Sequence, residues 1–268
     1  MNNYNVKIID VHTHVFPDKL ADRASHNIGA YYSIKMSCNG SIASLLDNAK
    51  DFTNIRFVIS SAALKEENVR HGNDFLLAAA EADKRFIPLG SVYPYMPTSE
   101  AIKQLVYIKE HGAKGIKLHP DFQRFEIDME SMTDVYKACA ELKLPILFHV
   151  GDENSDASSP KRLYNVMNKV PDLVAISAHM GGYQAWDEAE EILYGTNVYM
   201  DTSDALLCLP PERVMRQIER QGADKIMFGS DYPLRSTKEA FDLFQILPLT
   251  DEQKEQIYYK TAEKVFDL

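Results

Sequence analysis

The amino-acid sequence predicts an α/β protein with the (β/α)8 architecture of a TIM barrel. Eight short runs of apolar, often β-branched residues alternate with amphipathic stretches along nearly the whole chain. Such runs are typical of parallel strands, because these strands are buried on both faces. Eight strand–helix units in 268 residues match the usual size of this barrel.

The eight predicted strands are short and almost continuously apolar. They occupy residues 6–11, 55–60, 86–92, 115–118, 145–150, 173–178, 197–200 and 225–229. A doubly wound open sheet is the alternative, but it usually has fewer strands and a glycine-rich first turn. No glycine-rich turn follows the first strand of this chain, and this favours the barrel.

The stretches between the strands have the periodicity of helices, with apolar side chains such as Leu45, Ala49 and Phe52 on one face. The predicted helices occupy residues 42–52, 68–84, 99–110, 130–142, 160–169, 184–193, 211–220, 238–247 and 251–266. No linker rich in proline, glycine or serine divides the chain, so we expect residues 1–268 to form a single barrel domain. Residues 16–40 are long for a strand-to-helix connection, and we expect them to form a lid or binding loop.

Composition excludes several classes of protein. With 29 Lys and Arg against 39 Asp and Glu, the net charge is −10, which argues against a nucleic-acid partner. No apolar run reaches the ~20 residues of a membrane helix, and the first residues lack the features of a signal peptide. The three cysteines are far apart and typical of reduced thiols. We therefore expect a cytoplasmic protein without a nucleic-acid or membrane partner.

Ionisable side chains follow five of the predicted strands at their C-terminal ends, where a barrel of this kind carries its active site. They are His12, His14, Lys117, His119, His149, His179 and Asp231. Five of the eight histidines therefore fall in one ring of the barrel. Buried imidazoles and carboxylates cost free energy unless they are paired or ligated, so packing alone explains the group poorly.

The spacing of His12 and His14 places both side chains on one face of the first strand. Two imidazoles with a third imidazole and a carboxylate suit zinc or another divalent transition metal. Taken singly, each residue has a simpler interpretation. The two histidines could bond to the backbone, His149 could be a hydrogen-bonded core residue, and Asp231 could cap the following helix.

The motifs around these residues resemble the amidohydrolase superfamily, in particular the amidohydrolase-related branch of metal-dependent hydrolases, hydratases and non-oxidative decarboxylases. They follow the order of that family: IIDVHTHVFP (8–17), GIKLHP (115–120), ILFHVG (146–151), SAHMGG (177–182) and FGSDYP (228–233). The resemblance implies that His12, His14, His149 and Asp231 are metal ligands, with Asp231 alternatively the base. It implies that His179 is an acid/base residue or a ligand of a second metal.

Lys117 leaves two alternatives open. As an ammonium group it is a poor metal ligand and could hold a substrate carboxylate; carboxylated on its amine, it would bridge two metal ions, as in two-metal relatives. The related one-metal branch does without a bridging lysine, and this favours unmodified Lys117 and one divalent ion per chain, zinc before manganese. His119 lies on the same face and could be a ligand or a substrate contact.

The resemblance implies a hydrolase in which metal-bound hydroxide, aligned by Asp231, attacks a carbonyl of a small substrate. A lactone, ester or amide that carries a carboxylate fits this reaction. The alternative is a non-oxidative decarboxylase or hydratase acting on an aromatic or unsaturated carboxylic acid. A non-catalytic binding barrel would not keep an intact ligand set, and a nuclease of related fold expects glutamate in place of Lys117. Many barrels of the branch are dimers, which implies a homodimer.

Further side chains are expected near the rim of the barrel. They are Tyr31, Tyr32, Met36 and Cys38 in the long connection, then Tyr93, Tyr95, Arg124, Asp204 and Arg235 after later strands. Either arginine could bind a carboxylate, although most arginines are solvated surface residues. Trp186 is expected to anchor the helix after strand six to the core.

Overall fold

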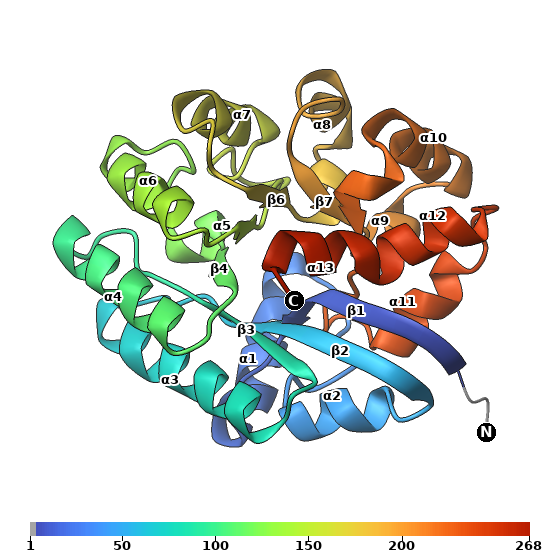
Figure 1. Ribbon diagram of the computed structural model, residues 1–268, viewed down its shortest axis with the longest axis horizontal. Helices are drawn as coiled ribbons and strands as arrows, with labels where there is room; N and C mark the ends of the chain where they lie inside the picture. Colours follow the sequence, from blue (N-terminus) through green and yellow to red (C-terminus); the bar gives the residue numbers. More distant parts are fainter. Residues whose placement is uncertain (1–3) are drawn as a thin grey trace.

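The computed structural model describes residues 4–268 and has the predicted (β/α)8 barrel (Figure 1). Its eight parallel strands are neighbours in sequence order. They are β1 (Tyr4–His14), β2 (Phe52–Ser60), β3 (Phe86–Gly90), β4 (Gly115–Leu118), β5 (Ile146–Phe148), β6 (Ala175–Ser177), β7 (Tyr199–Asp201) and β8 (Ile226–Met227). Backbone hydrogen bonds from Val11 N to Phe228 O (2.9 Å) and from His14 N to Tyr232 O (2.7 Å) join β1 to the chain at and after β8 and close the barrel.

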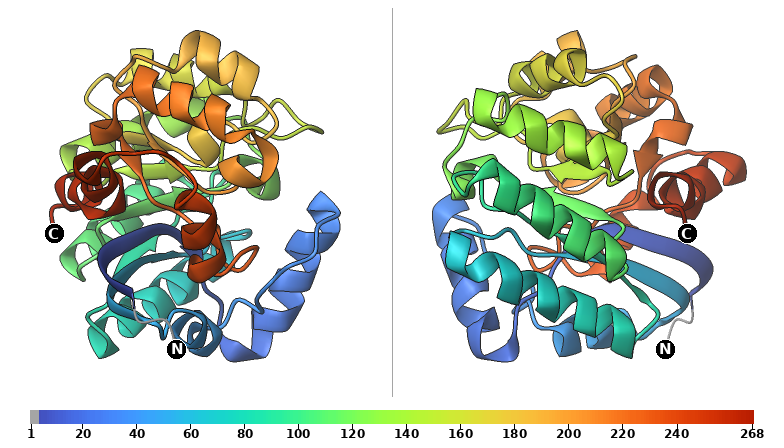
Figure 2. Two further views of the ribbon diagram at one scale, coloured as in Figure 1. Left: turned by 90° about the vertical axis from the view of Figure 1, so that its right-hand side faces the viewer. Right: turned by 60° about the vertical axis from the view of Figure 1, so that its left-hand side comes forward.

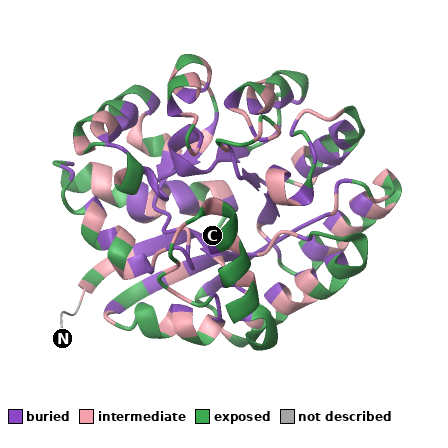
Figure 3. Ribbon diagram, turned by 180° about the vertical axis from the view of Figure 1, so that it is seen from behind, coloured by how far each residue is buried: buried purple, intermediate pink, exposed green. Residues whose placement is uncertain are grey.

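Helices surround the strands on the outside, with their buried faces toward the strands and their exposed faces outward (Figures 1 and 3). The α-helices are α1 (Asp18–Tyr32), α2 (Ile42–Asn48), α3 (Glu66–Ala82), α4 (Thr98–Glu110), α5 (Pro120–Gln123), α6 (Thr133–Glu141), α7 (Pro160–Lys169), α8 (Trp186–Ile192), α9 (Ala205–Cys208), α10 (Pro211–Gln221), α11 (Thr237–Phe244), α12 (Asp251–Glu255) and α13 (Thr261–Phe266). A π-helical turn, Gln256–Lys260, connects α12 to α13. Within the described residues, no helix is both long and apolar enough to span a membrane.

The C-terminal helix closes one end of the barrel. Ala262 and Phe266 of α13 pack with the apolar side chains that fill the barrel interior. The ion pair between Lys7 Nζ and Glu263 Oε1 (2.6 Å) places this helix beside the first residues of β1. The ring of ionisable side chains lies at the opposite end of the barrel, at the C-terminal ends of the strands.

The structure corrects several predicted boundaries. The predicted helix 42–52 is wrong at its end, because α2 ends at Asn48 and Phe52 already begins β2. The first strand extends to His14, so both histidines of the motif belong to the strand itself. The last four strands are shorter than predicted at one or both ends.

Helix α1 was not predicted from the sequence and occupies most of the connection 16–40. Its buried residues are Ala21, Ser25 and Gly29, a stripe of small side chains with no apolar periodicity for a sequence pattern to detect. In the left view of Figure 2, α1 forms an arm at the side of the barrel. The long connection is therefore a helix followed by a short return segment.

The core prediction concerns two neighbouring residues of α4 that differ in burial. Leu105 is fully buried, whereas Val106 is 37% exposed. Leu105→Ala should lower the free energy of unfolding by about 2–5 kcal/mol, because it removes buried methyl groups and leaves a cavity. Val106→Ala should change it by less than about 0.5 kcal/mol. Urea unfolding of both variants measures the difference, and equal midpoints would contradict this packing of α4.

Candidate active site

Three predicted residues meet at the C-terminal end of the barrel. The Nε2 atoms of His12 and His14 lie 3.2 Å apart, and Asp231 Oδ1 is 3.3 Å from each of them. The His12 side chain is fully buried, while His14 and Asp231 keep 14% and 18% side-chain exposure. Each of these three residues therefore directs one nitrogen or oxygen atom at a shared point close to solvent. His12 and His14 belong to β1, and Asp231 lies in the segment that follows β8.

The ionisation of this group fits a divalent metal ion. Burial lowers the pKa of His14 to about 4, so its imidazole is neutral near pH 7 and keeps a free lone pair. Burial opposes ionisation of Asp231, but the nearby His12, His14 and His179 hold its pKa below the usual range. Imidazole nitrogens with a carboxylate oxygen are the donors that zinc and related ions take. The residues present thus fit the metal that the family resemblance implies.

The side chain of Lys117, on β4, extends to the same group of donor atoms. Its side chain is fully buried, and Nζ lies 3.2 Å from His12 Nε2. Burial lowers the pKa of this amine to about 8, although Asp201 and Asp231 act in the opposite direction. A substantial fraction of the amine is therefore neutral near pH 8, and a neutral amine can react as a nucleophile.

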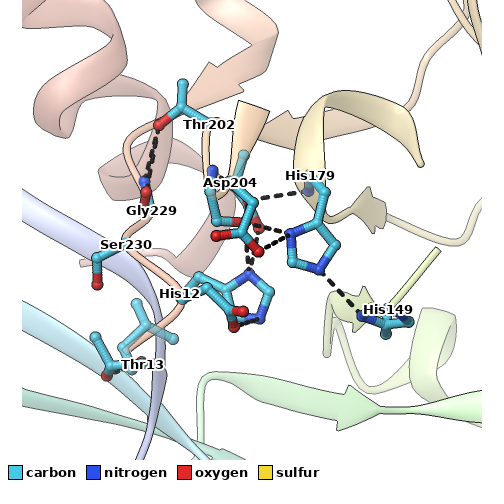
Figure 4. A network of polar contacts seen from close by, with 12 residues as sticks. His12, Thr13, His149, His179, Thr202, Asp204, Gly229 and Ser230 are labelled. Carbon is cyan, nitrogen blue, oxygen red and sulfur yellow. Dashed lines mark hydrogen bonds and ion pairs between the residues drawn. The ribbon is translucent and has the colours of Figure 1, made fainter. Parts of the chain in front are cut away.

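His149 and His179 form a second donor pair beside the first group. His149 Nδ1 lies 3.0 Å from His179 Nε2 (Figure 4). Burial lowers the pKa of both imidazoles, that of His179 to about 4. Among the described residues, His149 does not belong to the group formed by His12, His14 and Asp231. The structure therefore divides the four expected ligands between two neighbouring positions.

Asp201, the last residue of β7, was missed by the sequence analysis and organises both positions. This fully buried carboxylate accepts hydrogen bonds from His12 Nδ1 (2.9 Å), from His179 N (3.2 Å) and from Ser203 N (3.0 Å) and Oγ. Burial opposes its ionisation, but His12 and these hydrogen bonds lower the pKa of Asp201. Because His12 donates from Nδ1, its Nε2 lone pair faces the site. The predicted strand ended one residue earlier, and a single aspartate gives no pattern.

Backbone conformation at the site is unusual in three places. His179, Asp204 and Asp231 have φ of 60°, 58° and 56°, in the left-handed region that costs free energy for residues other than glycine. Such conformations cluster at functional sites.

Asp204, expected near the rim, lies beside His179 Nδ1 (3.6 Å). Burial, together with the nearby carboxylates of Asp231 and Asp201, raises the pKa of Asp204 well above its ordinary value.

Supporting contacts hold these segments in place. Asp10 accepts hydrogen bonds from Ser230 N (3.0 Å) and Thr237 Oγ1 (2.6 Å), so it fixes the start of the segment that carries Asp231. Trp186 Nε1 donates to His179 O (2.8 Å), which confirms its expected anchoring role.

Several of the other expected rim residues contact neighbouring segments of the rim. Arg235 donates to Ser37 Oγ (3.1 Å) on the segment after α1. Tyr95 donates to the backbone oxygen of Arg124. The rings of Tyr93 and Tyr95 are neighbours, with 5.7 Å between their centroids and an angle of 59° between their planes.

Residues 9–268 match the family model described as amidohydrolase. The chain belongs to the amidohydrolase family. No curated protein sequence matches it.

Solved structures share the fold of this chain. One is the uncharacterized TIM-barrel protein Bb4693 from Bordetella bronchiseptica, with 20% identity, 98% and 99% of the two chains covered and a TM-score of 0.80. Another is 5-carboxyvanillate decarboxylase from Sphingomonas paucimobilis, with 13% identity, coverage of 98% and 100% and a TM-score of 0.75. A candidate 2-pyrone-4,6-dicarboxylic acid hydrolase from Pseudomonas putida has 14% identity, coverage of 98% and 98% and a TM-score of 0.67.

The role of Asp201 can be tested through stability of the metal-free protein. Asp201→Asn should lower the free energy of unfolding at pH 7 by about 1–3 kcal/mol, because an amide cannot accept all the hydrogen bonds of the buried carboxylate. The folded-state pKa of Asp201 is lowered, so its contribution is present above the unfolded pKa of about 3.9 and is lost as the pH falls through the folded value.

The difference between wild type and variant should therefore be full at pH 7 and shrink below about pH 4. Asp172→Asn, at an exposed carboxylate, is the matched control and should leave stability within about 0.5 kcal/mol. Chemical unfolding in the presence of a chelator measures both variants. A difference that does not depend on pH would contradict an ionised Asp201.

Proposed function

We propose that this member of the amidohydrolase family is a metal-dependent hydrolase of small lactones, esters or amides. The proposal rests on one observation. Two groups of side chains with nitrogen or oxygen atoms suited to binding a metal ion lie next to each other, and a buried lysine amine lies beside the first group. The first group is His12, His14 and Asp231, and the second is His149 with His179. Lys117 Nζ stands 3.2 Å from His12 Nε2.

The sequence favoured one ion per chain and an unmodified Lys117; this proposal departs from that expectation and assigns one divalent ion, zinc or manganese, to each donor group. A bound divalent ion lowers the pKa of a water molecule to about 7 and polarises a substrate carbonyl. Lys117 serves the site as its carbamate, formed when the neutral amine adds to carbon dioxide and releases a proton. A divalent cation would repel an ammonium group beside His12 but would attract the anionic oxygens of the carbamate. The lowered pKa of Lys117 supports this step.

Asp231 is the residue proposed to accept a proton from the attacking water. Its carboxylate is ionised, and Oδ1 lies between the two Nε2 atoms of the first group. Asp204 lies beside Asp231, and burial together with the carboxylates of Asp231 and Asp201 raises the pKa of Asp204. A carboxylate in this position could accept a proton from a water molecule held by the first group.

A non-oxidative decarboxylase is the second candidate. It is favoured by several structural neighbours that are decarboxylases, including a dihydroxybenzoic acid decarboxylase from Polaromonas with bound manganese, at 18% identity, 99% and 98% coverage and a TM-score of 0.74. In that reaction Lys117 would remain an ammonium group and hold the substrate carboxylate as a point charge. The two candidates thus differ in the state of Lys117.

Substrate screening with Asp231→Asn tests the proposed function. Acid release from lactones, esters and amides and carbon dioxide release from hydroxybenzoates are measured in parallel on metal-loaded protein. We expect acid release, and Asp231→Asn should reduce kcat/KM by about 10²–10⁴-fold because the proton acceptor is lost. Asp172→Asn should retain wild-type kinetics. Carbon dioxide release alone would favour the decarboxylase, and full activity of Asp231→Asn would contradict the role of this carboxylate.

A further inference from the structure

Tyr32, the last residue of α1, connects this helix to the proposed metal site. Its Oη lies 3.2 Å from His149 Nε2 and 3.4 Å from His119 Nε2. Its ring lies against Phe122 and Tyr183, at centroid distances of 5.7 and 5.6 Å. The arm that α1 forms in Figure 2 therefore ends on the ring edges of two site histidines.

His119, His149 and Asp121 have possible ligand atoms within 4.8 Å of one another, yet the arrangement of the two histidine rings favours a hydroxyl partner over a further metal ion. The rings of His119 and His149 are stacked, with centroids 4.0 Å apart and an interplanar angle of 9°. Imidazole lone pairs lie in the ring plane, so two parallel rings cannot aim both of them at one ion about 2 Å away. The same two Nε2 atoms can both face one oxygen, and Tyr32 Oη occupies that place.

The position of the protons follows from the remaining contacts. His119 Nδ1 accepts a hydrogen bond from Phe122 N (3.5 Å), so the ring hydrogen is on Nε2 and points to Tyr32. His149 turns Nδ1 toward His179. A neutral imidazole that ligates a metal through Nδ1 carries its hydrogen on Nε2, which also faces Tyr32.

We propose that Tyr32 is a positioning residue that couples the docking of α1 to metal binding at the His149–His179 position. Its hydroxyl oxygen accepts a hydrogen bond from His149 Nε2. This bond holds the His149 ring in the orientation in which Nδ1 can bind the metal. Metal-ligating histidines usually donate their other N–H to such a partner, and a bound cation makes that N–H a stronger donor. This inference depends on the metal site proposed above.

The coupling works in both directions. If the docked α1 strengthens metal binding, the bound metal must stabilise the docked α1 by the same free energy. Most of α1 buries only small side chains, Ala21, Ser25 and Gly29, so its end at Tyr32 is a major attachment to the barrel. Metal occupancy should therefore be visible as reduced mobility of residues 18–32.

Tyr32→Phe tests the coupling, with Tyr31→Phe as the matched control. Tyr31 is 43% exposed, and its hydroxyl donates to Asp152 Oδ2 at the surface. Competition titration of metal-free protein with Zn²⁺ should show about 10–100-fold weaker binding of one ion in Tyr32→Phe, because the partner of His149 is lost. Hydrogen exchange of residues 18–32 should slow when Zn²⁺ binds to the wild type and to Tyr31→Phe, and should not slow in Tyr32→Phe.

The outcomes separate this inference from the proposed function. Equal Zn²⁺ affinity in all three proteins, with zinc-dependent protection of α1 in each, would overturn the role of Tyr32 and leave the metal site intact. Absence of Zn²⁺ binding by the wild type would overturn both. Equal weakening in Tyr31→Phe and Tyr32→Phe would point to general loosening of α1 and would also overturn the specific role of the Tyr32 hydroxyl.

Discussion

The buried hydrogen bond from His12 Nδ1 to Asp201 is the interaction on which the rest of the site depends. It decides which nitrogen of His12 keeps its lone pair, and that nitrogen lies within 3.3 Å of His14, Lys117 and Asp231. The same carboxylate accepts a hydrogen bond from the backbone of His179, so it holds the ends of three strands in one arrangement. Leaving so buried a carboxylate without these donors would cost several kcal/mol, roughly the stability margin of many proteins.

The barrel divides stability and chemistry between its two ends. One end is filled by apolar side chains and closed by α13. The other end collects imidazoles, carboxylates and one amine, and several residues there adopt left-handed backbone conformations. A closed ring of parallel strands can support such strain because neighbouring strands fix each segment through backbone hydrogen bonds.

The sequence predicted the features that depend on regular spacing. Alternation along a strand placed His12 and His14 on one face, and the strand–helix alternation predicted the barrel. It could not predict Asp201, whose function comes from its contact with a strand far away in the chain. It missed α1, because small residues rather than large apolar ones face the barrel. It expected His149 as a ligand together with His12, and it could not foresee that His149 lies next to His179 and stacks on His119.

Metal content per chain tests the central claim most directly. Protein purified without chelator or metal-affinity resin would be analysed for zinc and manganese by elemental analysis, before and after incubation with each metal. Two neighbouring donor groups with a carbamate of Lys117 predict about two ions per chain. About one ion would contradict the two-ion site and favour an unmodified Lys117. No bound ion, even after metal is added, would contradict the metal-dependent enzyme altogether.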